Sequence, residues 1–504
     1  MEEKQKIEER KEKFKSFLSN KYNLVLLGVL IFSAIIFFYY LSITSQQPLW
    51  WDEAEYMAIA KHWAFDIPYK IDPARPPLFP FLAFLLFKIG LSEILIKFII
   101  VILPAWLVVL FTYLLVKEMY NKKTALIAAF ITSVSWIHLF YAQRIMTDAV
   151  GLLFGLLAFY CFWKGYVNKE GKKYIWFTGI FIALSFLIRL TGILYGAILV
   201  VFLFITERFK PLKNKNLWLI PVFFLLTITP YFFYSMSNFG TPFAFKQGYA
   251  GGTGGKPLTF DVVSYFLRFV YDYPEFIFFI FFLAGLLTLI PMFLSLDILI
   301  FKKDKEYYPD LFMLLVILFT LFFFIYFLRD GENRWLIAMS IGIFTFSAKG
   351  ILFVYNQVSK NIGKSIAVAV LILILLAGTY YQLKHTNTII KIKKDSYLPV
   401  KEAGLWIKSH SNAGDIVLSL SEPQTVYYSE REVYRFQHFT EEQFDELVAE
   451  KKPRYMIVSI FENGHPEWSY NLPEKYQNLL KPVNVWYLDG AKTQTALIIY
   501  EFTY

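Results

Sequence analysis

Apolar runs of about 20 residues recur along the chain from residue 24 to residue 383, and after that they stop. An α-helix needs about 20 mostly apolar residues to cross the hydrocarbon layer of a membrane, which is roughly 30 Å thick. The composition agrees, because 57% of the residues are hydrophobic, 20% are aromatic and the mean hydropathy is +0.46. These values lie far above those of soluble proteins. The sequence therefore predicts a polytopic α-helical membrane protein.

Eleven segments are predicted to span the membrane. They are residues 24–43, 94–116, 124–143, 147–167, 174–189, 190–206, 217–234, 275–300, 311–328, 335–355 and 365–383. A further apolar stretch, residues 78–90, is short for a span and could be an interfacial or re-entrant helix or another crossing. We therefore expect about 11 transmembrane helices, within a range of about 11 to 13.

Lysine and arginine are concentrated in every second loop between these segments. Short cytoplasmic loops of membrane proteins are enriched in both residues. The basic loops contain Lys117, Lys122 and Lys123; Lys164, Lys169, Lys172 and Lys173; Arg208, Lys210, Lys213 and Lys215; Lys302, Lys303 and Lys305; and Lys360 and Lys364. We expect these loops and the basic segment 1–22 to be cytoplasmic. They account for much of the formal net charge of +10 without a nucleic-acid partner.

An odd number of crossings that begins in the cytoplasm places the C-terminal region on the extracytoplasmic face. The N-terminal segment lacks a convincing small-residue cleavage site, so we expect a retained signal anchor and a multi-pass protein of the cell membrane. Cys161, the only cysteine, lies in a predicted span. The sequence therefore excludes an intrachain disulfide and a cysteine-based metal site.

Residues 395–504 have the pattern of a soluble domain that follows a transmembrane domain at 23–390. Strands are predicted at Asp415–Leu420, Arg454–Ile460, Val483–Tyr487 and Thr495–Tyr500. Pro399–His410 has apolar residues at helical spacing, and Thr440–Lys451 begins with Thr-Glu-Glu-Gln, a helix start signal. We expect a small extracytoplasmic α/β domain. It contains no Gly-rich phosphate loop or nucleophile elbow, so its expected role is structural or acceptor-binding.

An acidic cluster flanked by aromatic residues follows the first predicted span, in the expected external loop 44–77. It reads Trp50-Trp51-Asp52-Glu53-Ala54-Glu55-Tyr56. Tryptophan suits the boundary between hydrocarbon and water. Carboxylates at such a boundary can take a proton from an attacking hydroxyl group or bind a cation. Asp52 and Glu53 are therefore the first candidates for catalysis.

Other ionisable residues of the membrane part lie near the outer ends of the predicted spans, away from the costly midplane. They are Arg75 in the first loop, Arg144 and Asp148 between two spans, Arg189 at a helix end, Lys246 and Lys256 in a Gly-rich loop, and Arg329, Asp330, Glu332 and Arg334 further on. We infer that these loops converge on one extracytoplasmic cleft. Carboxylates beside guanidinium groups suit transfer from a lipid-linked phosphate, because arginine matches phosphate with a planar fork of donors. A transporter would more often place its polar groups at mid-membrane.

The first external loop resembles that of a known family. Between Trp51 and Leu78 the chain contains Asp52-Glu53, Tyr56, Ala58-Ile59-Ala60-Lys61, Pro68 and Arg75-Pro76-Pro77-Leu78. This order is similar to that of the lipid-dependent glycosyltransferases with the multi-span C-type fold (GT-C), especially the group of protein O-mannosyltransferases and aminoarabinose transferases.

Weaker correspondences extend the resemblance over most of residues 24–355. Arg144 with Asp148 is similar to the family's second acidic position, for which a helix N-terminal cap is the alternative interpretation. Arg189-Leu190-Thr191-Gly192 is similar to its basic residue before a glycine, with snorkelling of Arg189 as the alternative. Glu332-Asn333-Arg334-Trp335 is similar to the family's Arg-Tyr stretch, although Trp335 replaces the tyrosine and the downstream proline is missing.

The resemblance implies transfer of a hexose or pentose from a polyprenyl- or dolichyl-phosphate donor to a protein, lipid or glycan acceptor at the outer membrane face, with inversion. Asp52 is then the expected general base, and Glu53 and Asp148 assist it. The expected ligands of the donor phosphate are Arg75, Arg144, Arg189 and Arg334. Further candidates for substrate binding are Tyr56, Lys246 and Glu332.

Three questions stay open at this point. No spacing requires a cofactor, yet Asp52, Glu53 and Asp148 could supply oxygen ligands to a divalent cation. A transporter of lipid-linked sugars would move the donor without covalent transfer. An oligosaccharyltransferase-type enzyme or glycan ligase would move a whole glycan, but its Trp-Trp-Asp-x-Gly motif does not occur after residue 395.

Overall fold

The computed structural model describes residues 5, 8, 19–246, 257–295 and 305–504. The chain divides into two compact units. Unit 1 consists of Met1–Ile43, Pro73–Leu78 and Lys97–Ile389. Unit 2 consists of Thr44–Asp72, Phe79–Ile96 and Ile390–Tyr504.

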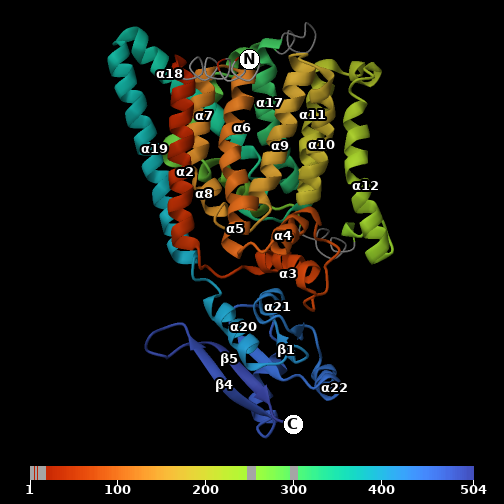
Figure 1. The fold of residues 1–504 in the computed structure, drawn as a ribbon. Coiled ribbons are helices and arrows are strands. Elements are labelled where there is room, and N and C mark those ends of the chain that lie inside the picture. The colour runs from red at the N-terminus through yellow and green to blue at the C-terminus, as the bar shows by residue number, and fades with distance from the viewer. Residues whose placement is uncertain (1–4, 6–7, 9–18, 247–256, 296–304) are drawn as a thin grey trace. The chain divides into compact units, whose positions relative to one another are not determined.

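Unit 1 is a bundle of long α-helices (Figure 1). Its principal helices are α2 (Lys21–Thr44), α6 (Leu103–Met119), α7 (Lys122–Val134), α9 (Asp148–Phe162), α10 (Lys172–Ile188), α11 (Ile193–Glu207), α12 (Leu219–Phe239), α15 (Glu275–Leu287), α17 (Tyr308–Phe322), α18 (Met339–Asn361) and α19 (Lys364–Lys393). Shorter helices are α8 (Trp136–Tyr141), α14 (Phe260–Asp272) and α16 (Ile290–Leu294). In the sequence, α9, α10 and α11 follow one another, and α10 packs against both α9 and α12.

Within the described residues, nine helices are long and apolar enough to cross a membrane. They are Lys21–Thr44, Glu93–Met119, Asp148–Val167, Leu190–Glu207, Leu219–Phe239, Glu275–Leu294, Lys305–Leu328, Met339–Asn361 and Lys364–Lys393. Each overlaps a span predicted from the sequence. The expected span at 174–189 is α10, a helix of 17 residues. The prediction of a multi-span α-helical membrane protein is confirmed.

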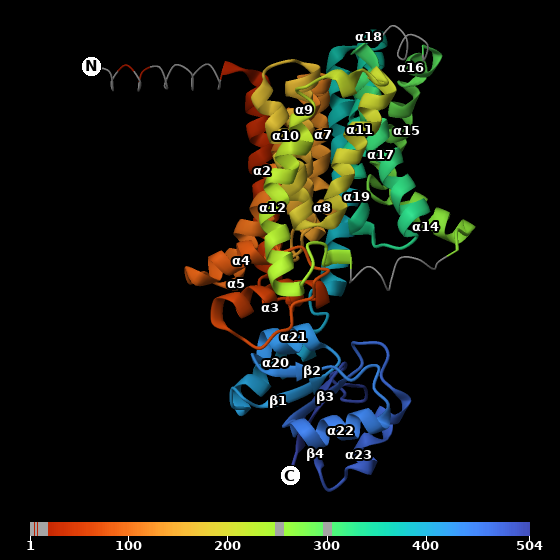
Figure 2. The ribbon, with the colours of Figure 1, turned by 90° about the vertical axis from the view of Figure 1, so that its right-hand side faces the viewer.

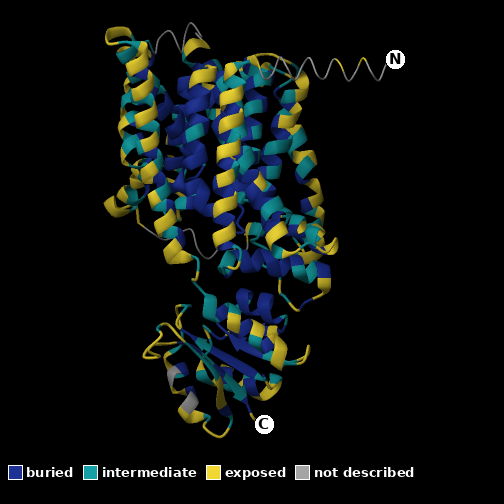
Figure 3. Ribbon diagram, turned by 60° about the vertical axis from the view of Figure 1, so that its left-hand side comes forward, coloured by how far each residue is buried: buried dark blue, intermediate teal, exposed yellow. Residues whose placement is uncertain are grey.

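Exposed residues line the outer faces of the bundle (Figure 3), and many of them are large and apolar. Val200 on α11, Phe233 on α12 and Leu373 on α19 are 65%, 72% and 67% exposed. Large exposed apolar surfaces mark contact with a membrane or another protein. Their position on helices of spanning length indicates that they face lipid.

The segment expected as one span at 124–143 is two helices. Ser135 adopts an extended backbone conformation (φ −62°, ψ 127°), so α7 ends at Val134 and α8 begins at Trp136. The freed backbone N–H of Trp136 donates a hydrogen bond to Oε1 of Gln382 on α19 (2.7 Å). Non-helical backbone at membrane depth is stable only where protein or trapped water satisfies it. Gln382, which is fully buried, fulfils that condition here.

The apolar stretch at 78–90 forms α4 (Leu78–Lys88), a helix of 11 residues. At 1.5 Å per residue it is about 16 Å long, roughly half of the hydrocarbon thickness. This helix is therefore too short to be a further crossing. Unit 2 contains all of α3 (Trp51–Phe65) and most of α4 and of α5 (Glu93–Lys97).

The C-terminal part of unit 2 is an α/β domain with a five-stranded sheet. The strands are β1 (Ile416–Ser419), β2 (Glu432–Tyr434), β3 (Tyr455–Ser459), β4 (Leu480–Tyr487) and β5 (Thr495–Phe502), in the order β2-β1-β3-β5-β4. The helices are α20 (Leu398–His410), α21 (Glu422–Ser429), α22 (Glu441–Lys451) and α23 (Leu472–Lys475). β1 is parallel to β2 and β3, whereas β5 is antiparallel to β3 and β4. The predicted α/β domain is confirmed, and β2, α21 and the short α23 are additions to it.

Alternate residues of the central strands build two cores, one on each face of the sheet. Val417 and Ile457 pack with residues of α20 and α21. Their neighbours Leu418 and Met456 pack with residues of α22 and α23. Successive side chains of a strand point to opposite faces, so this alternation follows directly from the sequence. The predicted start of α22 is also confirmed, because Thr440 and Gln443 form a reciprocal capping box.

Candidate active site

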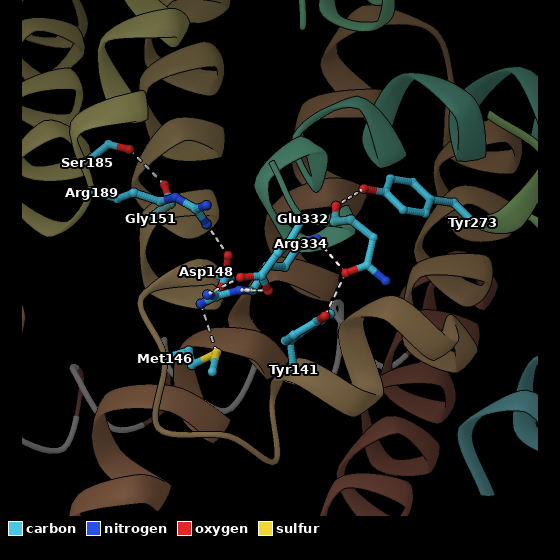
Figure 4. Close-up of polar contacts among 10 residues, drawn as sticks. Tyr141, Met146, Asp148, Gly151, Ser185, Arg189, Tyr273, Glu332 and Arg334 are labelled. Carbon is cyan, nitrogen blue, oxygen red and sulfur yellow. Dashed lines mark hydrogen bonds and ion pairs between the residues drawn. The ribbon is translucent and has the colours of Figure 1, made fainter. Parts of the chain in front are cut away.

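Asp148 is a buried carboxylate at the first residue of α9, and its side chain is 1% exposed. Its Oδ1 forms an ion pair with the guanidinium group of Arg189, and its Oδ2 lies 3.6 Å from Nη1 of Arg334 (Figure 4). The N-cap residue Thr147 makes no side-chain capping hydrogen bond. A buried charge is stable only when it is paired. Asp148 is therefore the centre of a clamp of two arginines, which we call the arginine clamp.

The end of α10 places Arg189 in this clamp. Arg189 has an extended backbone, and the chain then turns through a short 3-10 helix, Leu190–Gly192, into α11. A Cβ atom on Gly192 would lie 2.4 Å from the carbonyl carbon of Ser185, so only glycine permits this close turn. The hydroxyl group of Ser185 donates to the carbonyl oxygen of Gly151 on α9 (2.9 Å). This hydrogen bond fixes the end of α10 against the start of α9.

Arg334 connects the buried Asp148 with an exposed carboxylate. Its Nε and Nη2 donate to the two oxygens of Glu332, at 2.9 and 3.1 Å. Its Nη1 lies 3.0 Å from the sulfur of Met146. Arg334 is only 5% exposed, whereas the side chain of Glu332 is 55% exposed. The guanidinium group of Arg334 thus lies between two carboxylates, one buried and one exposed.

Two tyrosines hold the turn that carries Arg334. The hydroxyl group of Tyr141 donates to Oδ1 of Asn333 (2.6 Å), and that of Tyr273 donates to the carbonyl oxygen of Asn333 (Figure 4). Arg144 lies in the turn after α8, is 1% exposed, and donates its backbone N–H to the carbonyl oxygen of Tyr141 (3.2 Å). The sequence did not indicate either tyrosine, because their partners are 192 and 60 residues away.

A small cavity of about 30 Å³ lies beside the arginine clamp. Its lining includes Asp148, Arg189, Tyr195, Thr320 and Trp335. The guanidinium carbon of Arg189 is 5.8 Å from the centre of the Trp335 ring. A cavity of this volume holds one or two water molecules. The clamp therefore has a small cavity beside it, and the side chain of Arg189 is 17% exposed.

Two further basic residues lie near the same end of α10. Leu78 and Phe245 both pack against a core on α10 and α12 formed by Ala183, Leu187, Ile228 and Tyr231. Arg75 precedes Leu78 by three residues in the turn before α4, and Lys246 directly follows Phe245. Lys246 is exposed, 5.0 Å above the ring of Phe243. Lys256 and the rest of the Gly-rich loop, 247–256, lie outside the described residues.

In unit 2, the acidic pair stands in the first turn of α3. Glu53 is fully buried, and its Oε2 accepts a hydrogen bond from the backbone N–H of Trp50 (2.8 Å). Asp52 is only partly buried. Tyr56 is 5% exposed, with its ring packed edge-on against Phe79. Glu53 thus closes the start of the helix and Tyr56 lies in a core, whereas the more accessible carboxylate is that of Asp52.

Helix α21 of the α/β domain packs against α3. The backbone N–H of Leu49 donates to the hydroxyl oxygen of Tyr428 (2.8 Å). Nζ of Lys61 lies 2.8 Å from Oε1 of Glu430, which is also paired with Lys408. Burial alone would raise the pKa of Glu430, but the two lysines lower it below its ordinary value. The helix that carries Asp52 is therefore fixed to the C-terminal domain.

Part of the chain matches a known family model. Residues 74–234 match the model described as dolichyl-phosphate-mannose-protein mannosyltransferase. This range contains Arg75, Arg144, Asp148 and Arg189. No curated protein matches the chain in sequence.

Solved structures of two membrane enzymes have the same fold over nearly the whole chain. ArnT from Cupriavidus metallidurans, bound to undecaprenyl phosphate, matches with a TM-score of 0.68 and 12% identity, over 95% of this chain and 98% of that one. The archaeal oligosaccharyltransferase AglB from Archaeoglobus fulgidus, in complex with an inhibitory peptide and a dolichol-phosphate, matches with a TM-score of 0.60 and 14% identity, over 95% of this chain and 74% of that one. The chain has the GT-C fold. The resemblance inferred from its first loop is confirmed.

Within this GT-C chain, the sequence-predicted residues fall into two groups. Unit 1 brings Asp148, Arg189, Arg334 and Glu332 together. Unit 2 contains Asp52, Glu53 and Tyr56.

Several carboxylates of this GT-C chain are engaged by neighbouring donors. Both oxygens of Asp148 face guanidinium groups, and Glu53 closes a helix turn. Among the described residues there is no group of three or more His, Cys, Asp or Glu side chains that could hold a metal ion. Asp148 and Glu53 are thus both in contact with donor groups of the protein itself.

Proposed function

We propose that this protein is a glycosyltransferase that moves a sugar from a polyprenyl- or dolichyl-phosphate donor to a hydroxyl group of a protein, lipid or glycan. The observation that carries the proposal is the arginine clamp in a bundle with the GT-C fold. Two enzymes of this fold have been crystallised with undecaprenyl phosphate and dolichol-phosphate. A pair of guanidinium groups near the end of lipid-facing helices suits such a phosphate.

The clamp binds and neutralises the departing phosphate in this proposal. Arg189 and Arg334 are held in place by Asp148, which is buried too deeply to accept a proton from an acceptor and is thus a positioning residue. The charges of Asp148 and Glu332 balance those of the two arginines, and Arg144 brings a third, buried guanidinium group to the turn after α8. Arg75 and Lys246 add charge at the same end of α10. Preorganised positive charge of this kind stabilises the phosphate as it leaves.

Asp52 is the general base in the proposed single displacement. The acceptor oxygen forms a bond to the anomeric carbon while the bond from that carbon to the phosphate oxygen breaks. The hydroxyl proton passes to the Asp52 carboxylate, and the lipid phosphate keeps the bonding electron pair. The configuration at the anomeric carbon is inverted. General-base help contributes about 10² to 10⁴ in rate, so the phosphate clamp must supply a further part of the acceleration.

The charge distribution of unit 1 supports an extracytoplasmic site. The basic connections α6–α7, α9–α10, α11–α12 and α18–α19 lie at the end of the bundle where α2 begins (Figure 1). Asp148, at the start of α9, and Arg189, at the end of α10, lie at the other end. Basic loops stay in the cytoplasm. The clamp then faces the outside of the cell membrane, where the donor's sugar would be presented.

The test is sugar transfer by the purified full chain. It is incubated with radiolabelled mannosyl, glucosyl, galactosyl and arabinosyl polyprenyl phosphates and a membrane extract as the source of acceptors. We expect label on an acceptor with the wild type and none with Asp52→Asn, which retains the wild-type unfolding temperature. Equal transfer by both proteins would remove Asp52 from the mechanism, and tight donor binding without transfer would contradict the proposed reaction.

A further inference from the structure

In the sheet of the α/β domain, successive connections add strands first on one side of β1 and then on the other. β1 is followed by α21 and then by β2 on one side, after which the chain passes through α22 to β3 on the other side of β1. Both connections join parallel strands (Figure 2). In open α/β sheets, ligands bind beyond the carboxyl ends of the strands at such a switch point. The switch point here lies between β1 and β3.

Polar side chains follow each of the three parallel strands at this edge. Ser421 and Glu422 follow β1, Arg435 follows β2 and Glu462 follows β3. The hydroxyl group of Ser421 donates to Oε1 of Glu462 (3.2 Å). Arg435 is exposed and is hydrogen-bonded to Gln437, whose Nε2 donates to the carbonyl oxygen of Asn463 (2.8 Å). We call Ser421, Glu422, Arg435 and Glu462 the switch-point cluster.

The charges of the switch-point cluster are balanced. Burial raises the pKa of the Glu422 carboxyl group above its ordinary value, against the opposing charges of Arg435 and Lys70. Burial also raises the pKa of Glu462, although the hydrogen bond from Ser421 and the charge of Arg435 lower it in part. Two carboxyl groups thus face one guanidinium and one ammonium group. This balance favours a neutral ligand rich in hydroxyl groups over a strongly charged one.

A cavity of about 360 Å³ adjoins the cluster. It is lined by residues 458–460, 462–465 and 495–498, including Glu462 and His465. Gly464 has a φ of +87°, and a Cβ atom there would lie 2.4 Å from Nε2 of Gln437. The positive φ favours glycine at this position of the loop. A cavity of this volume is in the range of ligand sites and takes a single sugar ring.

The cluster also reaches the start of the helix that carries Asp52. The guanidinium carbon of Arg435 is 4.9 Å from the centre of the Trp51 ring, and Trp51 directly precedes Asp52. A guanidinium group at this distance is attracted to the face of the indole ring. A ligand held by Arg435 is thereby brought to the first turn of α3.

We propose that the carboxyl edge of the α/β domain, formed by Ser421, Glu422, Arg435 and Glu462 with the adjoining cavity, binds a neutral glycan as the acceptor. The role of this glycan as the acceptor rests on the proposed function, whereas the binding of a glycan at this site does not depend on it. The carboxyl groups accept hydrogen bonds from sugar hydroxyls, and Arg435 and Ser421 donate them. The domain then selects the acceptor and presents its hydroxyl group beside Asp52.

Saturation-transfer NMR of the full chain in detergent tests the site without any donor. The probes are mannotriose, maltotriose and chitotriose, with trilysine as a charged peptide of similar size. We expect saturation transfer to at least one trisaccharide, most of which is lost in Arg435→Ala and Glu462→Gln. Arg454→Ala is the matched control, because Arg454 pairs with Asp415 and Glu501 at the opposite edge of the sheet. It should bind as the wild type does.

Three outcomes would overturn the site. The first is that no trisaccharide shows saturation transfer, and the second is that trilysine alone shows it. The third is that the wild type and both cluster variants give equal trisaccharide signals. The result is separable from the enzyme's reaction, because Asp52→Asn should bind the trisaccharide normally. Binding that depends on Arg435 without any sugar transfer would refute the proposed function and leave the site standing. Sugar transfer with an unchanged acceptor KM in Arg435→Ala would refute the site alone.

Discussion

The guanidinium group of Arg189, at the end of α10, is paired with the carboxylate of Asp148, at the start of α9. The two residues are 41 positions apart, and the hydrogen bond from Ser185 to Gly151 fixes the same two helices one turn deeper. The ion pair therefore joins two helix ends and orients a cationic group in one step. Arg334, the second arginine beside Asp148, joins the turn before α18 to the start of α9 in the same way.

Asp148→Asn should disrupt the arginine clamp. Loss of the charge removes the carboxylate that pairs with Arg189 and lies beside Arg334, while Arg334 keeps its contact with Glu332. Breaking a buried ion pair costs about 3–5 kcal/mol, so we expect a lower unfolding temperature in detergent. We also expect sugar transfer to fall at least about 10²-fold, the effect of losing preorganised charge stabilisation.

Glu332→Gln is the matched control for this variant. Its carboxylate contacts the same Arg334, but the side chain is mostly exposed, and exposed ion pairs contribute about 0–1 kcal/mol. The unfolding temperature should therefore stay close to that of the wild type. Equal losses of stability and transfer in the two variants would show that Asp148 has no special place in the clamp.

Acid should loosen the contact between α3 and the α/β domain through Glu430. Because the folded protein holds the pKa of Glu430 below its ordinary value of 4.5, the ionised form favours folding. This stabilisation is fully present above about pH 4.5 and is lost as the pH falls through the lower value of the folded protein. We expect the unfolding temperature of the wild type to fall more steeply below about pH 4.5 than that of Glu430→Gln. Parallel pH profiles for the two proteins would contradict this, and the exposed Glu432→Gln should follow the wild type.

Gln382→Leu should destabilise the interrupted helix pair α7–α8. Gln382 accepts from the backbone N–H of Trp136 and donates to the carbonyl oxygen of Tyr273 (2.7 and 2.9 Å). Each buried polar group left without a partner costs about 1–3 kcal/mol. We expect a marked drop in unfolding temperature, whereas Thr388→Ala, an exposed position on the same helix, should change it little. A Gln382→Leu variant as stable as the wild type would mean that the break at Ser135 does not depend on Gln382.

The orientation in the membrane can be measured by cysteine labelling. Cys161, the only cysteine, is buried and is first replaced by serine. Lys246→Cys then tests the end of the bundle that holds the arginine clamp, and Lys360→Cys tests the opposite end. Both lysines are exposed. An impermeant maleimide added to intact cells should label Lys246→Cys and spare Lys360→Cys, and the reverse pattern would place the clamp in the cytoplasm.

The fold could be predicted wherever the signal is local. A long run of apolar residues is sufficient to predict a spanning helix, and a short apolar run is sufficient to predict β1 and β3. The break at Ser135 has no such signal, because its satisfying partner Gln382 lies 246 residues beyond Trp136. α21 was missed because Glu422–Ser429 is short and has no helical periodicity. It is buried on α3 and α20, which only the folded chain reveals.

The site could be predicted as a set of residues but not as a network. Asp148, Arg189 and Arg334 were all candidates, since charges near span ends require an explanation. That the two arginines share one carboxylate could not be predicted, because it depends on which helix ends meet. Glu332 was expected to bind substrate, and in the structure it binds Arg334. Tyr141 and Tyr273 could not be singled out among 34 tyrosines.

The central claim is that the protein breaks the bond between the sugar and the lipid phosphate. A polyprenyl-phosphate sugar labelled with tritium in the sugar and with phosphorus-32 in the phosphate tests it in one turnover. We predict that tritium appears on the acceptor while an equal amount of phosphorus-32 remains as free polyprenyl phosphate, and that Asp52→Asn separates neither label. If the two labels stay together on intact donor and move between vesicles, the protein is a transporter and the account is wrong.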